Sequence, residues 1–142
     1  MNLIDVYRDV ERSRHLLYAL LLEREAHESI SHRIMPGWNE HCEFIDSKPY
    51  EAWYLIYEDI QVPDFGVEHM PIGATYLTKN REIGIGILKA DRRMGHAEWA
   101  IKELMRRHPG KFLANIAPRN EKSILLFEKL GFRLIQNTYE KT

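Results

Sequence analysis

The chain of 142 residues contains a single cysteine, Cys42, and little else that would staple a small fold. One thiol cannot form an intramolecular disulfide, and it excludes a cysteine-rich zinc site. Long apolar runs are also missing: the longest extends from Leu16 to Leu22, well short of a membrane-spanning helix. Charged residues interrupt the N-terminal segment at Asp5, Arg8 and Asp9, unlike a signal peptide. These absences predict a cytoplasmic protein with no membrane partner.

An excess of either charge is absent as well. Lys and Arg number 20 against 21 Asp and Glu, which gives a net charge of −1. A protein that neutralises nucleic-acid phosphate usually carries a basic excess, so we expect no nucleic-acid partner. With 44% hydrophobic and 29% charged residues the chain belongs to the globular class, and its length predicts one domain over residues 1–142. No spacing of His, Asp and Glu indicates a metal site.

Hydrophobic periodicity predicts an α/β domain with this sequence of elements. Leu16, Leu17 and Leu20 form the apolar stripe of a first helix. The first expected elements are an edge strand over Leu3–Tyr7 and helices over Ser13–Arg24 and Trp38–Asp46. Three strands follow over 52–57, Ile72–Thr78 and Arg81–Leu88, and a loop containing Pro63 and Gly66 separates the first two of these strands. The remaining elements are a helix from Ala97 to before Pro109, a strand over Phe112–Ala117, a helix capped by Asn120 and ended by Gly131, and a last strand over Phe132–Tyr139.

The segment Glu82–Ala97 runs from a strand through a glycine-containing turn directly into an amphipathic helix. Unpaired N–H groups and the dipole make a helix N-terminus a site for anions such as phosphate or pyrophosphate. Gly95 keeps a Cβ out of the approach, and Arg92, Arg93 and His96 can add positive charge. An ordinary strand-to-helix connection with solvated arginines explains the same residues. A P-loop is excluded, because no Lys-Ser/Thr pair follows the glycine.

Two motifs resemble one family. Arg92-Arg93-Met94-Gly95-His96-Ala97 is similar to the Arg/Gln-x-x-Gly-x-Gly/Ala signature of the GNAT superfamily of N-acetyltransferases. Downstream, Asn120–Phe132 resembles its second motif, Asn-x-x-Ser-x-x-x-Tyr-x-Lys-x-Gly-Phe. The likeness covers about residues 72 to 136. Within it, Glu82–Leu88 resembles the branch that acetylates ribosomal-protein N-termini and small or sugar amines.

The resemblance implies a mixed central sheet of six or seven strands, splayed between strands four and five and flanked by about four helices. It also implies acetyl-CoA as the cosubstrate. The backbone amides of the first motif would hold the pyrophosphate, the fourth strand would pair with the pantetheine arm, and the second motif would contact that arm. The cofactor-binding residues implied in this way are Ile87, Leu88, Arg92, Arg93, Met94, Gly95, His96, Ala97, Asn120, Ser123 and Phe127.

Phe127 departs from the family pattern, because many members carry a tyrosine there that protonates the departing thiolate. A phenyl ring donates no proton. Thiols titrate near pH ~8.5, so the CoA thiolate can instead take a proton from water or from the attacking ammonium. The departure therefore weakens the case for a dedicated acid rather than the case for acetyl transfer. An ordinary core residue is the other interpretation of Phe127.

Glu82 is the candidate catalytic base, since it matches a glutamate found at the start of this strand in many members of the superfamily. Glu82, Gly84 and Gly86 share one face of the strand, and the two glycines leave room beside the carboxylate. The alternative is an ion pair of Glu82 with Lys79 or Arg81 at a hairpin end, with glycines that only accommodate packing.

His32 and His41 are candidate substrate-binding residues, because the helix pair before the second strand forms the acceptor pocket in the family. A lone histidine is also often a satisfied or surface residue. Only ten residues follow Phe132, so the last strand would leave an open sheet edge. An edge of that kind predicts a homodimer in which a partner subunit covers it.

The sequence thus predicts an acetyl-CoA-dependent N-acetyltransferase that acts by direct attack of a bound primary amine. The expected acceptor is a small molecule, with an amino sugar as one candidate. Three alternatives stay open at this point: a protein N-terminal acetyltransferase, a non-catalytic acyl-CoA-binding or sensing module, and a nucleotide-phosphate-binding domain.

Overall fold

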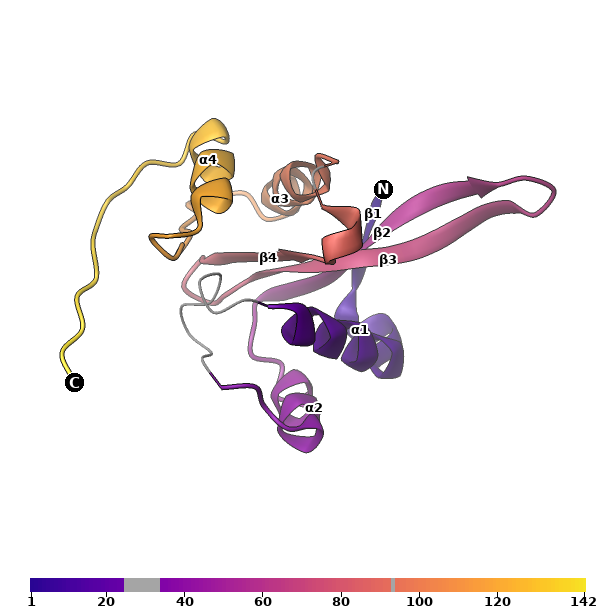
Figure 1. Cartoon of the computed structure of the whole chain (residues 1–142), viewed down its shortest axis with the longest axis horizontal. Coiled ribbons are helices and arrows are strands. Elements are labelled where there is room, and N and C mark those ends of the chain that lie inside the picture. Colours follow the sequence, from indigo (N-terminus) through magenta and orange to yellow (C-terminus); the bar gives the residue numbers. More distant parts are fainter. Residues whose placement is uncertain (25–33, 93) are drawn as a thin grey trace.

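A four-stranded antiparallel sheet, in the order β1-β2-β3-β4, forms the centre of the fold (Figure 1). The computed structural model describes residues 1–24, 34–92 and 94–142. The strands are β1 (Asn2–Asp5), β2 (Ala52–Val62), β3 (Gly66–Leu77) and β4 (Ile83–Ile87). The helices are α1 (Val10–Glu23), α2 (Trp38–Asp46), α3 (His96–Arg107) and α4 (Glu121–Lys129), with short 3₁₀ helices η1 (Val6–Asp9) and η3 (Lys89–Asp91).

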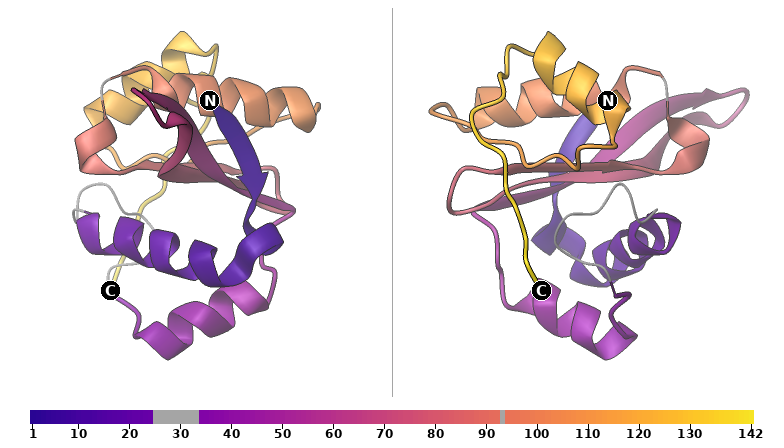
Figure 2. Two further views of the ribbon diagram at one scale, coloured as in Figure 1. Left: turned by 90° about the vertical axis from the view of Figure 1, so that its right-hand side faces the viewer. Right: turned by 60° about the vertical axis from the view of Figure 1, so that its left-hand side comes forward.

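The helices cover both faces of the sheet, α1 and α2 on one and α3 and α4 on the other (Figure 2). Each face has its own core, because successive residues of a strand point to opposite sides. In β2, Ile56 packs with Ile101 and Leu104 of α3, whereas Leu55 packs with Leu17 of α1 on the other face. This two-sided burial is the reason that β2 is apolar on both faces, as the sequence indicates.

Two predicted strands are not formed. The stretch 112–117 meets the chain just before the start of β4 at one parallel bridge, Glu82 opposite Leu113, and forms no ladder with the strand. The segment Phe132–Tyr139 is extended but belongs to no strand. The sheet of the described residues therefore has four strands rather than six or seven. A strand exists only where a neighbour supplies its hydrogen bonds, and local propensity does not reveal that neighbour.

The first strand and the β2–β3 hairpin also differ from prediction. The chain turns into η1 at Val6, so β1 ends before Tyr7. The hairpin is much longer than expected: its pairing extends to Val62 opposite Gly66, and the arm projects beyond the rest of the sheet (Figure 1). Residues 58–71 were predicted as a loop because polar side chains hide the alternation there, although Pro63 does mark the turn.

The two ends of α4 are those predicted from sequence. The Asn120 Oδ1 atom accepts a hydrogen bond from the Ser123 N–H at 3.3 Å and caps the helix. Gly131 adopts the left-handed conformation, with φ at +93°, and the Phe132 N–H donates to the Phe127 carbonyl oxygen at 2.9 Å. These contacts make a Schellman cap with glycine in the position just past the helix.

Gly73 of β3 lies where the backbone of β4 leaves no room for a side chain. An added Cβ would lie 2.2 Å from the Gly86 carbonyl oxygen. We expect Gly73→Ala to lower the free energy of unfolding by about 3 kcal/mol, because backbone cannot move aside cheaply. Urea denaturation measures this. Gly37→Ala is the matched control, since a Cβ there meets nothing within 4 Å. Equal stability of the two variants would contradict the β3–β4 packing.

Candidate active site

One edge of β4 is paired with β3 along the strand, while the other edge is paired only at the first residue of the strand. On the β3 side the ladder continues to the end of the strand, where the Leu88 N–H donates to the Ile72 carbonyl oxygen at 2.8 Å. On the opposite side the Ile83 N–H donates to the Leu113 carbonyl oxygen at 2.8 Å, and no described residue extends the ladder past this point. We call this divergence of β4 from residues 112–117 the splay.

Ile85 and Ile87 present their backbone groups to the splay. Alternate residues of a strand direct their N–H and C=O groups to opposite edges, so Ile85 and Ile87 face the same way as Ile83. The Ile87 carbonyl oxygen accepts a hydrogen bond from Arg92 Nε at 3.0 Å. Within the described chain this leaves both N–H groups and the Ile85 carbonyl available to an extended ligand.

The prediction named Ile87 and Leu88 for this role, and the structure places them differently. Ile87 faces the splay, but the Leu88 amide is used in the bond to Ile72 and faces β3. Ile85, which the sequence analysis did not select, is the second residue on the open edge. The period-2 alternation along β4 could have identified it once Ile87 was chosen.

Gly95 connects the splay to the N-terminus of α3. Its φ of +76° lies in the left-handed region that favours glycine, and an added Cβ would meet nothing within 4 Å. No side chain of the described residues caps the helix, whose first backbone bond runs from the Trp99 N–H to the Gly95 carbonyl oxygen at 3.1 Å. The amides of residues 96–98 therefore form an anion-attracting helix end, while the Ala97 side chain packs towards the core.

The turn before Gly95 is tied to the opposite face of the sheet. The Lys89 N–H donates to Glu23 Oε1 at the end of α1, at 2.6 Å. Met94, which precedes the glycine, is 69% exposed. Arg93 lies outside the described residues. The hydrogen bond from Lys89 to Glu23 holds the turn after β4 against the end of α1.

The predicted cationic side chains have other contacts. Arg92 reaches back to the Ile87 carbonyl, so it lies along the end of β4. His96 is buried, with Nε2 at 3.7 Å from Glu58 Oε1 on β2. The helix end thus depends on backbone N–H groups more than on the imidazole that the sequence suggested.

Glu82 lies just before β4, at the bridge to Leu113 where the stretch 112–117 is still paired with the sheet. Its Oε1 atom accepts a hydrogen bond from Thr78 Oγ1 at 3.3 Å, and its Oε2 atom accepts one from Asn115 Nδ2. Asn115 belongs to the diverging stretch, so this second contact crosses the start of the splay. The half-buried carboxylate is held from two sides at the base of the open edge.

The predicted alternative for Glu82, an ion pair with Arg81, is not formed. The Arg81 guanidinium donates to the carbonyl oxygens of His108 and Lys111, at 2.6 and 2.9 Å, and approaches Glu51 at 3.6 Å. Arg81 therefore connects the β3–β4 hairpin to the end of α3, and among the described residues the donors to the Glu82 carboxylate are the neutral side chains of Thr78 and Asn115.

Gly84 makes room for an aromatic ring rather than for a substrate. A Cβ on Gly84 would lie 1.9 Å from Tyr76 Cζ, whereas one on Gly86 would make an ordinary 3.7 Å contact with Leu20. The Tyr76 ring stacks on Tyr50, with centroids 4.1 Å apart and planes 4° from parallel. The packing interpretation thus accounts for Gly84. Burial raises the pKa of both tyrosines, so both hydroxyls stay protonated at neutral pH.

His41 is a structural residue between α1 and α2. It is 4% exposed, its Nε2 lies 2.9 Å from the Arg14 carbonyl oxygen, and its ring packs against Trp38 and Tyr18. Burial lowers its pKa, which keeps the imidazole neutral. These contacts do not support the predicted role in substrate binding. His32, the other predicted histidine, lies outside the described residues.

The second motif is placed by α4. The Asn120 Oδ1 atom is occupied by the helix cap, so the amide nitrogen is the atom left to donate to a ligand. Ser123 is half-buried in the first turn. Phe127 is 4% exposed and packs edge-on against Phe132, at 5.1 Å between ring centroids. This burial agrees with the interpretation of Phe127 as a core residue.

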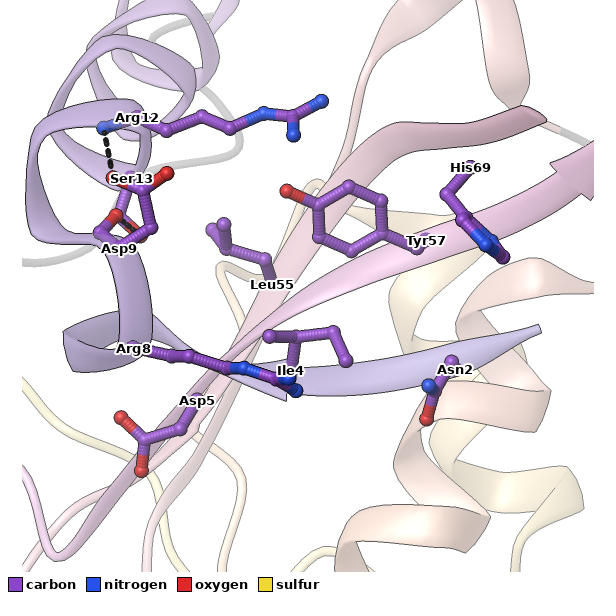
Figure 3. A pocket seen from close by; sticks show the side chains of 10 residues that line it. All are labelled: Asn2, Ile4, Asp5, Arg8, Asp9, Arg12, Ser13, Leu55, Tyr57 and His69. Carbon is purple, nitrogen blue, oxygen red and sulfur yellow. Dashed lines mark hydrogen bonds between the residues drawn. The ribbon is translucent and has the colours of Figure 1, made fainter.

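A separate hollow of about 530 Å³ lies beside β1, at the opposite edge of the sheet from the splay (Figure 3). Both carboxylates of its lining accept hydrogen bonds from nearby backbone groups. Asp5 accepts one from the Tyr7 N–H at 2.8 Å, and Asp9 accepts one from the Arg12 N–H at 3.2 Å. The hollow contains none of the motif residues. Its lining consists of Asn2, Ile4, Asp5, Arg8, Asp9, Arg12, Ser13, Leu55, Tyr57 and His69.

Metal ligands and membrane-spanning helices are both missing from the part of the chain that the structure describes. No three His, Cys, Asp or Glu side chains gather there closely enough to hold a metal ion. No helix in the same part has the length and apolar character to cross a membrane.

Together, a sheet that splays after β4 and an uncapped helix that follows a left-handed glycine give the chain the fold of the GNAT acetyltransferases. The ribosomal-protein-alanine N-acetyltransferase from Brucella melitensis is similar, with a TM-score of 0.66 and 13% identity over 94% of this chain and 85% of that one. A GNAT superfamily phosphinothricin acetyltransferase from Sinorhizobium meliloti, in complex with acetyl-CoA, has a TM-score of 0.64 and 22% identity over 95% and 76%.

A domain from Methanocaldococcus jannaschii is also similar, with a TM-score of 0.77 and 18% identity over 98% of this chain and 92% of that one. No family model and no curated protein sequence matches the chain. The family resemblance inferred from the two motifs is therefore confirmed at the level of the fold.

Proposed function

We propose that residues 1–142 form one acetyltransferase domain, which transfers the acetyl group of acetyl-CoA to the primary amine of a small molecule such as an amino sugar. The observation that carries this proposal is the open edge of β4 leading directly into the uncapped N-terminus of α3. The GNAT fold supports acetyl-CoA as cosubstrate, and the S. meliloti neighbour holds it within that fold.

Acetyl-CoA supplies a thioester carbonyl for the amine to attack and a thiolate as the leaving group. In this chain the amides of residues 96–98, beside the open side of Gly95, would bind the diphosphate. The N–H groups of Ile85 and Ile87 would pair with the amide-containing arm of the cosubstrate and extend the sheet by one strand.

Glu82 would accept the proton of the attacking amine, directly or through one water. Only the neutral amine has a lone pair, and deprotonating a lysine-like amine at pH 7 costs about 4–5 kcal/mol. The carboxylate lies at the base of the splay, where Thr78 and Asn115 hold it without cancelling its charge. Because Phe127 is buried and donates no proton, the thiolate would be protonated by water or by the ammonium.

Two alternatives have observations in their favour. The B. melitensis neighbour is named a ribosomal-protein-alanine N-acetyltransferase, which favours a protein as acceptor. The buried Phe127 favours a non-catalytic acyl-CoA sensor, because no acid occupies that position. Both alternatives share the cosubstrate site with the main proposal and differ from it only after acetyl-CoA has bound.

Acetyl-CoA is expected to raise the melting temperature of the protein. At a hundred times its Kd, a ligand adds about 2.7 kcal/mol of stability, which corresponds to about 5 °C or more for a domain of this size. A thermal shift with ATP and none with acetyl-CoA would overturn the proposed function. Release of free CoA over a panel of amino sugars, other small amines and N-terminal peptides then separates an enzyme from a sensor and a small acceptor from a peptide.

A further inference from the structure

Four polar side chains gather on the face of β4 that α1 covers, next to the candidate base. Each of them is half-buried, so each keeps part of its surface open to solvent: Arg24, Tyr50, Tyr76 and Glu82. The cosubstrate site does not use the arginine or the two tyrosines, because the open edge of β4 and the N-terminus of α3 supply backbone groups for it. The four side chains are therefore available to the acceptor.

Tyr76 brings its hydroxyl to the same side of β4 as the Glu82 carboxylate. Tyr76 pairs with Gly84 across the β3–β4 ladder, and a Cβ on Gly84 would overlap the tyrosine ring and its hydroxyl oxygen. Glu82 precedes Gly84 by two residues, so its side chain projects from that same face. Burial is the main cause that raises the pKa of Tyr76, and the negative charge of Glu82 adds to the rise. The carboxylate and the hydroxyl are thus neighbours.

The end of α1 lies over the other end of this face (Figure 2). A Cβ on Gly86 would lie 3.7 Å from Leu20 Cδ2, and Glu23 Oε1 accepts the hydrogen bond of the Lys89 N–H at 2.6 Å. Arg24 comes directly after Glu23 and is the residue that ends the helix. Two independent contacts therefore hold the base of the Arg24 side chain beside the end of β4.

Arg24 brings a positive charge to this face without a carboxylate to neutralise it. Burial raises the pKa of Tyr50 and of Tyr76, and the Arg24 guanidinium opposes the rise in both, so its charge lies near both phenols. Within the described chain Arg24 forms no ion pair and no side-chain hydrogen bond. A guanidinium presents parallel N–H donors that match a carboxylate or a phosphate, so the unpaired arginine is a binding group for an anion.

We infer that the acceptor carries an anionic group, a carboxylate or a phosphate, in addition to its primary amine. Arg24 would bind the anionic group, the hydroxyls of Tyr50 and Tyr76 would lie along the acceptor, and the amine would lie at Glu82. A purely cationic amine is disfavoured, because the unpaired guanidinium repels it. The inference rests on the proposed function and narrows its substrate class.

Matched acceptors test the inference: glucosamine 6-phosphate against glucosamine, and alanine against alaninamide. The members of each pair differ in the anionic group and share the amine. We expect kcat/KM for the release of free CoA to be about 10-fold higher or more for the anionic member of at least one pair, because a charge-assisted hydrogen bond is worth about that much. The pair that shows the preference distinguishes phosphate from carboxylate. Equal values within both pairs, or a preference for the neutral members, overturn the inference.

Arg24→Gln is expected to reduce the ratio of kcat/KM between the two members to about one, because glutamine donates hydrogen bonds but carries no charge. Arg24→Lys keeps the charge without the parallel donors and should keep part of the ratio. Arg8→Gln removes an exposed arginine beside β1, at the opposite edge of the sheet, and should keep the whole ratio. A loss that is equal for both members would mean that Arg24 only supports the end of α1, and it overturns the inference.

Binding without turnover separates this inference from the proposed function. Saturation-transfer NMR on the protein loaded with free CoA measures the binding of the same four acceptors. Anionic acceptors that bind the wild type and not Arg24→Gln, without release of CoA from acetyl-CoA, would support the anion site and contradict the proposed activity. Release of CoA with no preference for an anionic acceptor overturns the anion site alone. If no anionic acceptor binds or reacts, the inference is overturned as well.

Discussion

Gly95→Asp should remove the stabilisation that acetyl-CoA gives while leaving the free protein folded. The position has φ at +76°, which aspartate tolerates better than most residues, and an added Cβ meets nothing within 4 Å. The new carboxylate lies at the N-terminus of α3, where it neutralises the helix end and repels a diphosphate. We expect at least a 100-fold loss of affinity, and a melting temperature that no longer responds to acetyl-CoA.

Gly95→Asn is the matched control, because asparagine has the same shape and the same tolerance of the left-handed conformation but no charge. It should retain most of the thermal shift. Binding by Gly95→Asp at the wild-type level would show that the helix end is not the anion site. An equal loss in both variants would show that bulk, rather than charge, excludes the ligand.

The parts of the fold that were predictable from sequence depend on neighbours along the chain. The helix α4 is an example: Asn120 and Gly131 lie at its two ends and their roles follow from local chemistry. The strand predictions were wrong where pairing with a segment distant in the sequence determines whether a strand forms. Phe132–Tyr139 has the composition of a strand but pairs with no strand of the described chain. The polar arm of the β2–β3 hairpin is paired although its side chains do not alternate as expected.

The residues of the candidate site also divide into those that local sequence identifies and those that only long-range contacts reveal. Gly95 and Glu82 could be selected because each belongs to a motif within a few residues of sequence. Asn115 could not, because its contact with Glu82 joins residues that are far apart in the chain. For His41 the family position gave a substrate-binding role and a satisfied residue as alternatives, and the sequence does not show that the imidazole is buried against the carbonyl of Arg14. A site built from contacts across a sheet is visible only in three dimensions.

Glu82→Gln is expected to lower kcat/KM at pH 7 by about 100-fold with an amine identified in the acceptor panel, because a positioned base contributes a factor of that order or more. Glutamine keeps the size of the side chain, and its amide oxygen can still accept from Thr78 or Asn115. Acetyl-CoA binding, measured by the thermal shift, should be unchanged. Steady-state release of free CoA measures the loss.

The dependence on pH separates a base from a structural carboxylate. As the pH approaches the pKa of the amine, ~10 for a lysine-like acceptor, the neutral amine is present without help and the difference between variant and wild type should narrow. Glu128→Gln, an exposed carboxylate on α4, makes the same chemical change away from the splay and should leave the rate unaltered. A deficit of Glu82→Gln that stays constant from pH 7 to high pH would mean that Glu82 holds the start of the splay together through Asn115 and takes no proton.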